Sequence, residues 1–423
     1  MKILIRFNRF LCAAMATAWC LTAQSQDVPG ADVESLLSIA RYGNPEYAGS
    51  RQEAVAAYER VQPAGALPDP KLLVELMDIT QGGQQNPTLN PGLVGSARYT
   101  IMQDVPWFGK RDLRREIAEL DADSAKKSAQ VTWNDVATRI KATYAQRYYL
   151  LRNKILTEEI LDLMRRLEKI AQARYARDLA AQQDVIRAQV EQTRMRTELI
   201  TLENERKKMD TRLNALLARP ANAPLSNPQR LRPLPPPTQL SYAVLEQQVR
   251  AHNPQLSIEE SRLESAEKNR ELTYKNRYPD FFFGVAPNQF QNSVQQWNVL
   301  VGLNIPLQQE TRRSQERESE AMVLVARSRR QATTNQVLAD LAENISGLDA
   351  ARKTEALATN TLLPQSELTF KSALAGYENG RVDFATLLDA QRQIRIAKQD
   401  QIRAQAEGQI RLAEIERILG EFL

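Results

Sequence analysis

Residues 110–219 begin KRDLRREIAELDADSAKK, end KKMDTRLNALLAR and contain neither Gly nor Pro. Gly and Pro are the residues that most disfavour a helix interior, and the stretch is rich instead in Ala, Leu, Glu, Gln, Lys and Arg, which favour one. A single helix of this length would extend for about 165 Å. The pattern therefore predicts either a coiled coil or a long helical hairpin with a turn hidden in the run.

The second half of the chain locates that turn. The heptapeptide YENGRVD contains Gly380, which suits the left-handed residue that ends many helices. Its counterpart in the first half is YARDLAA, with Asp178 in place of the glycine. We therefore expect a hairpin whose outbound helix runs from about Lys110 to Ala176 and whose return helix runs from about Gln182 to Ala218.

The whole chain repeats in the same way. A helical segment, two strand-like segments and a long helical region occur twice, and seven prolines lie between the two copies. Self-similarity of this kind indicates a duplication. The matching residues are Asn44-Pro45 with Asn253-Pro254, Val105-Pro106 with Ile305-Pro306, Tyr175 with Tyr377, and Leu216-Leu217 with Ile418-Leu419.

We expect a signal peptide at residues 1–25 and a proline-rich linker at 220–240. Repeat 1 would occupy 26–219, with strands at about 70–79 and 95–105. Repeat 2 would occupy 241–423, with strands at about 280–287 and 297–305. Each repeat would end in a long helical hairpin.

The first 25 residues have the features of a secretory signal. Three basic residues precede a short apolar run, and Ala23-Gln24-Ser25 fits the small-residue cleavage rule. Both cysteines, Cys12 and Cys20, lie inside this segment, and the bulky Trp19 before Cys20 does not suit a lipid-attachment site. We expect an exported protein that uses no disulfide bonds.

Charge and motifs exclude several classes of protein. Without the signal the chain has 53 basic and 51 acidic residues, a balance that indicates no nucleic-acid partner. The sequence contains no P-loop, nucleophile elbow or HExxH motif, so we do not expect an enzyme. His252 is the only histidine, and one histidine without cysteines cannot form a dedicated transition-metal site. No metal or cofactor is expected.

The four strand-like segments alternate between apolar and other residues. The alternation is strict in the last segment, where the apolar positions are Trp297, Val299, Val301, Leu303 and Ile305. In the other segments they are Leu72, Val74 and Leu76; Ala97, Tyr99, Ile101 and Val105; and Phe281, Phe283 and Val285. Such alternation is typical of outer-membrane barrel strands and equally of a half-buried soluble sheet. Closed membrane barrels start at about eight strands, so a membrane location would require several copies of the chain.

With these elements in order, the mature chain resembles the TolC family of outer-membrane efflux channels over essentially its whole length. The resemblance is carried by Tyr377, Gly380 and the run Leu387-Leu388-Asp389-Ala390-Gln391, together with the Asn-Pro pairs and the duplicated order of elements. Residues 103–111, QDVPWFGKR, resemble the strand-to-helix junction of the heavy-metal efflux branch of that family.

The resemblance implies a mainly α fold with a small β part. Three chains would form a homotrimer with a helical α-barrel and a 12-stranded β-barrel, four strands from each chain. The β-barrel would lie in the outer membrane of a Gram-negative bacterium, and the helices would form a large periplasmic portion. The protein would passively conduct metal cations or small toxic compounds. An inner-membrane pump, of the resistance-nodulation-division (RND) type, would supply them through a periplasmic adaptor.

The resemblance also implies two groups of site residues. The helix-hairpin turns would contact the adaptor through Arg177, Asp178, Leu179, Ala180, Asn379, Gly380, Arg381, Val382 and Asp383. The pore constriction would involve Asp389, Asp184 and Thr386. Asp389 matches the constriction aspartate of the family, whereas Thr386 stands where the family can place another acid.

Two other functions remain open at this point. A type I secretion exit channel has the same architecture. A periplasmic coiled-coil adaptor or scaffold also has helical hairpins, but it lacks a tandem duplication with four barrel-type strands. An adaptor would be recovered as a soluble periplasmic protein on fractionation.

Overall fold

The computed structural model describes residues 28–290 and 293–423, so the expected signal peptide lies outside the described residues. The chain divides into two compact units. Unit 1 contains the described residues up to Pro45, together with Asp135–Gln239 and Asn344–Ile415; unit 2 contains Glu46–Asn134, Leu240–Glu343 and Glu416–Leu423. Each unit takes segments from both repeats, because the long helices continue from one unit into the other.

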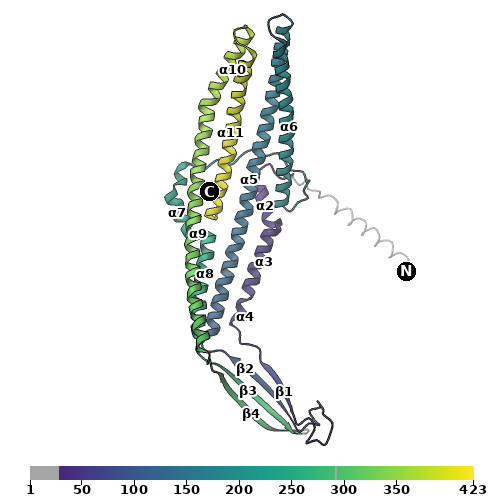
Figure 1. Cartoon of the computed structure of the whole chain (residues 1–423), viewed down its shortest axis with the longest axis vertical. Helices are drawn as coiled ribbons and strands as arrows, with labels where there is room; N and C mark the ends of the chain where they lie inside the picture. Colours follow the sequence, from purple (N-terminus) through teal and green to yellow (C-terminus); the bar gives the residue numbers. More distant parts are fainter. Residues whose placement is uncertain (1–27, 291–292) are drawn as a thin grey trace, which may run out of the picture. The chain divides into compact units, whose positions relative to one another are not determined.

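In both halves, short helices are followed by two strands and then by a long helical hairpin (Figure 1). The first half has α2 (Val33–Gly43), α3 (Pro45–Glu59), α4 (Val61–Gly65), β1 (Lys71–Met77), β2 (Ser96–Val105), α5 (Lys110–Tyr175) and α6 (Gln182–Leu216). The second half has η1 (Pro237–Leu240), α7 (Tyr242–His252), α8 (Pro254–Lys275), β3 (Asp280–Phe290), β4 (Ser293–Asn304), α9 (Gln309–Leu357), η2 (Ala358–Leu362), α10 (Leu363–Glu378) and α11 (Phe384–Leu419).

The breaker-free stretch forms the predicted hairpin. Helix α5 ends at Tyr175 and α6 begins at Gln182, within one residue of the predicted turn. The equivalent outbound path in the second half is interrupted, because α9 and α10 are joined by a π-helical turn at Ala358–Leu362. Pro364 follows at the start of α10. It has no N–H to donate to the carbonyl of Asn360, and a wider turn accommodates the missing hydrogen bond. Helix α5 has no such interruption over its 66 residues.

The two Asn-Pro pairs have the same structural role. The side-chain amide of Asn44 donates to the carbonyl of Leu216 at 2.8 Å, and that of Asn253 donates to the carbonyl of Ile418 at 2.6 Å. Both asparagines are buried. Each satisfies a carbonyl at the end of a return helix, where intrahelical partners run out. The motif therefore fixes the end of α6 in unit 1 and the end of α11 in unit 2.

The strands form one antiparallel sheet in the order β1-β2-β3-β4 (Figure 1). Cross-strand partners project from the same face of a sheet. Leu72 pairs with Ile101, Ile101 with Val285, and Val285 with Val299, so the predicted apolar positions share one face. The alternation inferred from the sequence is confirmed.

The second hairpin is longer than the sequence pattern predicts. Strand β3 continues to Phe290 and β4 starts at Ser293, whereas strands were expected only at about 280–287 and 297–305. Residues 288–290 and 293–296 are mainly polar and are typical of a connector. They pair nonetheless, for example Asn288 with Gln296, because backbone hydrogen bonding does not depend on the side chain.

Ion pairs on the opposite face of the sheet join neighbouring strands. Arg98 on β2 lies 3.4 Å from Glu75 on β1 and donates to Asn288 on β3 at 3.0 Å. Lys71 on β1 lies 2.7 Å from Asp104 on β2. The sheet therefore has one apolar face and one face on which charged, polar and apolar residues are mixed.

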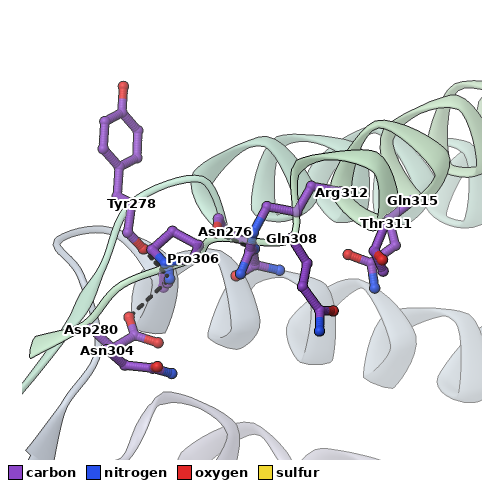
Figure 2. A pocket seen from close by; sticks show the side chains of 10 residues that line it. Asn276, Tyr278, Asp280, Asn304, Pro306, Gln308, Thr311, Arg312 and Gln315 are labelled. Carbon is purple, nitrogen blue, oxygen red and sulfur yellow. Dashed lines mark hydrogen bonds and ion pairs between the residues drawn. The ribbon is translucent and has the colours of Figure 1, made fainter.

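The sheet meets the helices of unit 2 at a polar junction (Figure 2). Asp280, the first residue of β3, accepts from the backbone N–H of Trp107 at 2.7 Å and from the buried ammonium of Lys110 at 2.8 Å. Lys110 also donates to the carbonyl of Tyr278 at 3.0 Å. The junction thus binds the start of α5 in repeat 1 to the start of β3 in repeat 2. None of the helices in the described part of the chain is both long and apolar enough to cross a membrane.

Candidate functional site at the helical tips

The two hairpin turns of unit 1 have the same backbone form. Asp178 has φ 58° and Gly380 has φ 72°, so both turns use the left-handed conformation expected at Gly380. Aspartate is one of the few non-glycine residues that adopt this region readily. The replacement of the glycine by Asp178 therefore preserves the shape of the first turn.

Most of the predicted adaptor-contact residues are on the surface. Arg177, Asp178, Leu179, Asn379, Gly380, Arg381 and Asp383 are exposed, and Ala180 and Val382 are half-buried. Leu179 is a large apolar residue with 60% of its surface exposed. The tips thus offer a mixed charged and apolar surface.

Arg174 joins the two turns. Its guanidinium donates to the carbonyl of Leu179 at 3.0 Å and to the carbonyl of Glu378 at 2.5 Å. It also lies over the ring of Tyr377, 5.0 Å from the centroid. Arg174 is not among the predicted tip residues, because its counterpart in the second repeat is Gly376 and the repeat gives no sign of the contact.

Tyr377 makes a second contact between the hairpins. Its ring is buried, packs 5.3 Å from the ring of Phe384, and belongs to a core shared by α5, α6, α10 and α11. Its hydroxyl donates to the carboxylate of Asp184 on α6 at 3.3 Å. Burial and the negative charge of Asp184 raise the pKa of Tyr377 to about 12. Asp184, which was predicted to lie at the constriction, therefore accepts a hydrogen bond from Tyr377 of the same chain.

This contact predicts a loss of stability at high pH. Because the pKa of Tyr377 is higher in the folded protein than in the unfolded chain, where it is about 10, its contribution is complete below pH 10. That contribution falls as the pH rises through about 12. We expect the Tm followed by circular dichroism to drop more between pH 9.5 and 11.5 in the wild type than in Tyr377→Phe. The exposed Tyr175→Phe should behave as the wild type, and equal drops in all three proteins would contradict the assignment.

Asp383 and Thr386 form a helix cap. One carboxylate oxygen of Asp383 accepts from the backbone N–H of Thr386 at 2.9 Å and from its hydroxyl at 2.6 Å. These hydrogen bonds lower the pKa of Asp383. The pair begins α11 and so fixes where the second turn ends.

Further along the helices from the turns, two ion pairs join α6 to α11. We call the pairs Glu191–Arg392 and Glu198–Arg395 the charge ladder. Their nitrogen–oxygen distances are 2.5 and 2.8 Å. Gln399 adds a hydrogen bond to Glu198 at 3.4 Å. Sequence reasoning missed these residues, because a charged residue on a long helix gives no indication of which neighbour it faces.

Asp389 lies on α11 beside the charge ladder. Its side chain is 67% exposed, and its carboxylate is 3.3 Å from Arg392. The two tips bring Asp184, Thr386 and Asp389 into one region of unit 1, but each contacts a different partner. Among the described residues, no group of three or more His, Cys, Asp or Glu side chains is placed to hold a metal ion.

The sequence was compared with protein families and with curated proteins. Residues 245–421 match the family model described as outer membrane efflux protein. No curated protein matches the chain by sequence.

Several solved structures share the fold. The outer membrane protein VceC of Vibrio cholerae is 15% identical, with 92% of this chain and 96% of that chain covered and a TM-score of 0.79. CusC, whose structures concern transmembrane channel formation, is also 15% identical, with 92% of each chain covered and a TM-score of 0.79. A membrane protein from Pseudomonas aeruginosa is 18% identical, with coverages of 93% and 91% and a TM-score of 0.77.

At such identities the likeness to the solved structures concerns the fold, and the sequence match to the family covers residues 245–421. The predicted resemblance to the TolC family is confirmed. Residues 245–421, in the second repeat, are similar to the outer membrane efflux protein family, and over its described length the chain has the fold of solved outer-membrane channels.

Proposed function

We propose that this protein is the outer-membrane exit duct of a tripartite efflux system. The observation that carries the proposal is the sheet, whose apolar face is uncovered within the described chain. Trp297, Val299 and Val301 are each at least 70% exposed on that face. A contiguous apolar surface of this kind is unfavourable in water and marks a contact with lipid or protein.

The edges of the sheet support the same conclusion. In the described chain, β1 and β4 each pair on one side only. Unpaired strand edges cannot lie in lipid, so a membrane-embedded sheet must close. Four strands per chain are too few, and the family resemblance selects three copies with twelve strands. The period-two pattern then places the apolar face toward lipid and the mixed face toward the lumen.

The exposed tips serve as the docking surface for a periplasmic adaptor in this proposal, and an inner-membrane RND pump supplies the energy. Asp389 provides the carboxylate at the pore constriction, since a ring of like charges attracts cations and hinders anions. Conductance of Asp389→Ala in planar bilayers tests that role, and unchanged cation selectivity would count against it.

The cargo is metal cations or small toxic compounds. The resemblance of residues 103–111 to the heavy-metal branch favours a metal cargo. The fold itself favours no cargo, because VceC and CusC match it with the same TM-score. A metal cargo would pass without a dedicated binding site, given that no ligand cluster occurs among the described residues.

Deleting the gene tests the function and the cargo together. We expect the deletion strain to become several-fold more sensitive to metal salts, to small toxic compounds, or to both, and the wild-type gene to restore resistance. The purified protein should conduct ions in planar bilayers. Recovery of the protein as a soluble periplasmic species, with unchanged sensitivity of the strain, would refute the proposal.

A further inference from the structure

The junction between β2 and α5 carries a run of four residues, Trp107-Phe108-Gly109-Lys110, that the role of an exit duct alone does not explain. Lys110 is buried, and its ammonium donates to Asp280 and to the carbonyl of Tyr278. Tyr278 lies three residues beyond the end of α8. Lys110 therefore fixes the backbone of Tyr278 beside the start of α5.

Three aromatic rings surround Trp107. Its indole stacks on the rings of Tyr278 and Phe281, with centroids 5.1 and 5.5 Å apart, and Phe108 meets it edge-on at 5.8 Å. Phe281 is the second residue of β3 and pairs with Leu303, so it belongs to the apolar face of the sheet. The aromatic cluster, which we define as Trp107, Phe108, Tyr278 and Phe281, therefore lies at the end of the apolar face that adjoins the helices.

The aromatic cluster is open to its surroundings and has unused hydrogen-bond donors. Phe108 is 78% exposed and Tyr278 is 51% exposed. Neither the indole N–H of Trp107 nor the hydroxyl of Tyr278 has a hydrogen-bond partner among the described residues. Figure 2 shows the ring of Tyr278 pointing away from Asp280 and Asn304, which line the polar pocket. Aromatic side chains with a polar tip favour the boundary between hydrocarbon and headgroups.

Lys275, the last residue of α8, adds a positive charge beside this cluster. A Cβ at Gly109 would collide with the ammonium nitrogen of Lys275, so the glycine leaves room for that side chain. In the part of the chain that the structure describes, this half-buried ammonium has no hydrogen bond or ion pair. The neighbouring Arg277, by contrast, is paired with Glu316. A half-buried charge without a counter-ion is unfavourable, which suits the site to an anionic group.

We propose that this junction binds the phosphate diester of a phospholipid headgroup, whose acyl chains lie on the apolar face. The proposal rests on the proposed function, which places that face in lipid, and deepens it by naming the lipid group bound at the end adjoining the helices. Lys275 provides the charge, Trp107 and Tyr278 donate hydrogen bonds to the phosphate and ester oxygens, and Phe108 contacts the acyl chains.

The second repeat does not contain the same site. The residues that correspond to Trp107-Phe108-Gly109-Lys110 are Leu307-Gln308-Gln309-Glu310. They include no aromatic residue and no glycine, and a glutamate replaces the lysine. We therefore expect one phospholipid site of this kind in each chain.

Tryptophan fluorescence tests the contact with lipid. Apart from Trp19 in the expected signal peptide, the tryptophans are Trp107, Trp133 and Trp297. Variants that keep one of these three, with phenylalanine at the other two, are reconstituted in phosphatidylcholine vesicles brominated near either end of the acyl chain. We expect Trp107 to be quenched several-fold more by bromine near the headgroup than by bromine near the methyl end. Trp297, on the apolar face, should also be quenched, whereas Trp133, which packs against Tyr47 on α3, should not.

A titration tests the recognition of the phosphate. Short-chain phosphatidylethanolamine is added to the detergent-solubilised protein that keeps only Trp107, and its emission is followed to saturation. We expect diacylglycerol with the same chains to bind several-fold more weakly, and inorganic phosphate more weakly still. Lys275→Gln should weaken the binding of the phospholipid several-fold, and Lys275→Arg should restore it. Lys371→Gln, which changes an exposed lysine on α10, is the matched control and should bind as the parent protein does.

The outcomes separate this site from the channel itself. Equal binding of phospholipid and diacylglycerol, or unchanged binding by Lys275→Gln, would overturn the phosphate site. Inorganic phosphate that binds as tightly as the phospholipid would overturn the lipid as its ligand. Quenching of Trp297 without quenching of Trp107 would overturn the lipid contact of the junction and leave the channel intact. Absence of quenching at both positions would count against the proposed function as well.

Discussion

Replacing Val299 by arginine is expected to abolish assembly in the outer membrane. Val299 lies near the middle of β4, on the apolar face of the sheet, with 76% of its surface exposed. An arginine at the midplane of a membrane barrel costs about 2–4 kcal/mol, and each of the three copies would incur this cost. We expect the variant to be missing from outer-membrane fractions, and a strain that depends on it to be as sensitive as the deletion strain.

The adjacent residue provides the matched control. Asn298 pairs with Ala286 and lies on the mixed face, which already carries Arg98. Asn298→Arg should therefore reach the outer membrane and support export. If Val299→Arg also assembles normally, the apolar face does not contact lipid. If both variants fail, arginine is tolerated on neither face of β4, and Asn298 does not face a polar lumen.

Reversing the charge ladder is expected to widen the proposed pore constriction. In Arg392→Glu/Arg395→Glu, the pairs with Glu191 and Glu198 change from attraction to repulsion. Each pair is partly exposed and contributes on the order of 0.2–1 kcal/mol, but a trimer holds six such pairs, and each reversal also adds repulsion. We expect the single-channel conductance in planar bilayers to rise several-fold.

Restoring the opposite charges should reverse the effect. Adding Glu191→Arg and Glu198→Arg to the double variant rebuilds both pairs in the opposite sense, so the conductance should return toward the wild-type value. Arg403→Glu is the control on the same helix, because the ion pair of Arg403 within the described residues is with Asp400, three residues earlier on α11. A double variant with wild-type conductance and native circular dichroism would show that other contacts, such as those of Arg174 and Tyr377, hold the two hairpins together.

The helices and the faces of the strands were predictable from the sequence because they depend on local patterns. The absence of Gly and Pro between Lys110 and Arg219, with Gly380 as a guide from the second repeat, located both turns. Alternation assigned each strand residue to a face. The ends of β3 and β4 were misplaced because their polar residues pair through the backbone alone.

The contacts of the tip were less predictable. Tyr377, Asp184, Asp383 and Thr386 were identified individually or through the family resemblance, but their partners were not. Arg174 and the charge ladder were missed altogether. The contacts between the two hairpins link residues about 200 positions apart, and which residues meet depends on the rotation of long helices about their axes. A single sequence contains no direct signal of that rotation.

The π-helical turn at Ala358–Leu362 has a consequence for how force passes along the helices. In a trimer, three outbound helices would be continuous rods of 66 residues, and three would contain this joint. Each continuous α5 would resist bending. The π-helical turn between α9 and α10 would allow α10 to move together with α11. The two repeats would thus contribute outbound helices that differ in stiffness. The more flexible one is the helix of repeat 2, which contains Pro364.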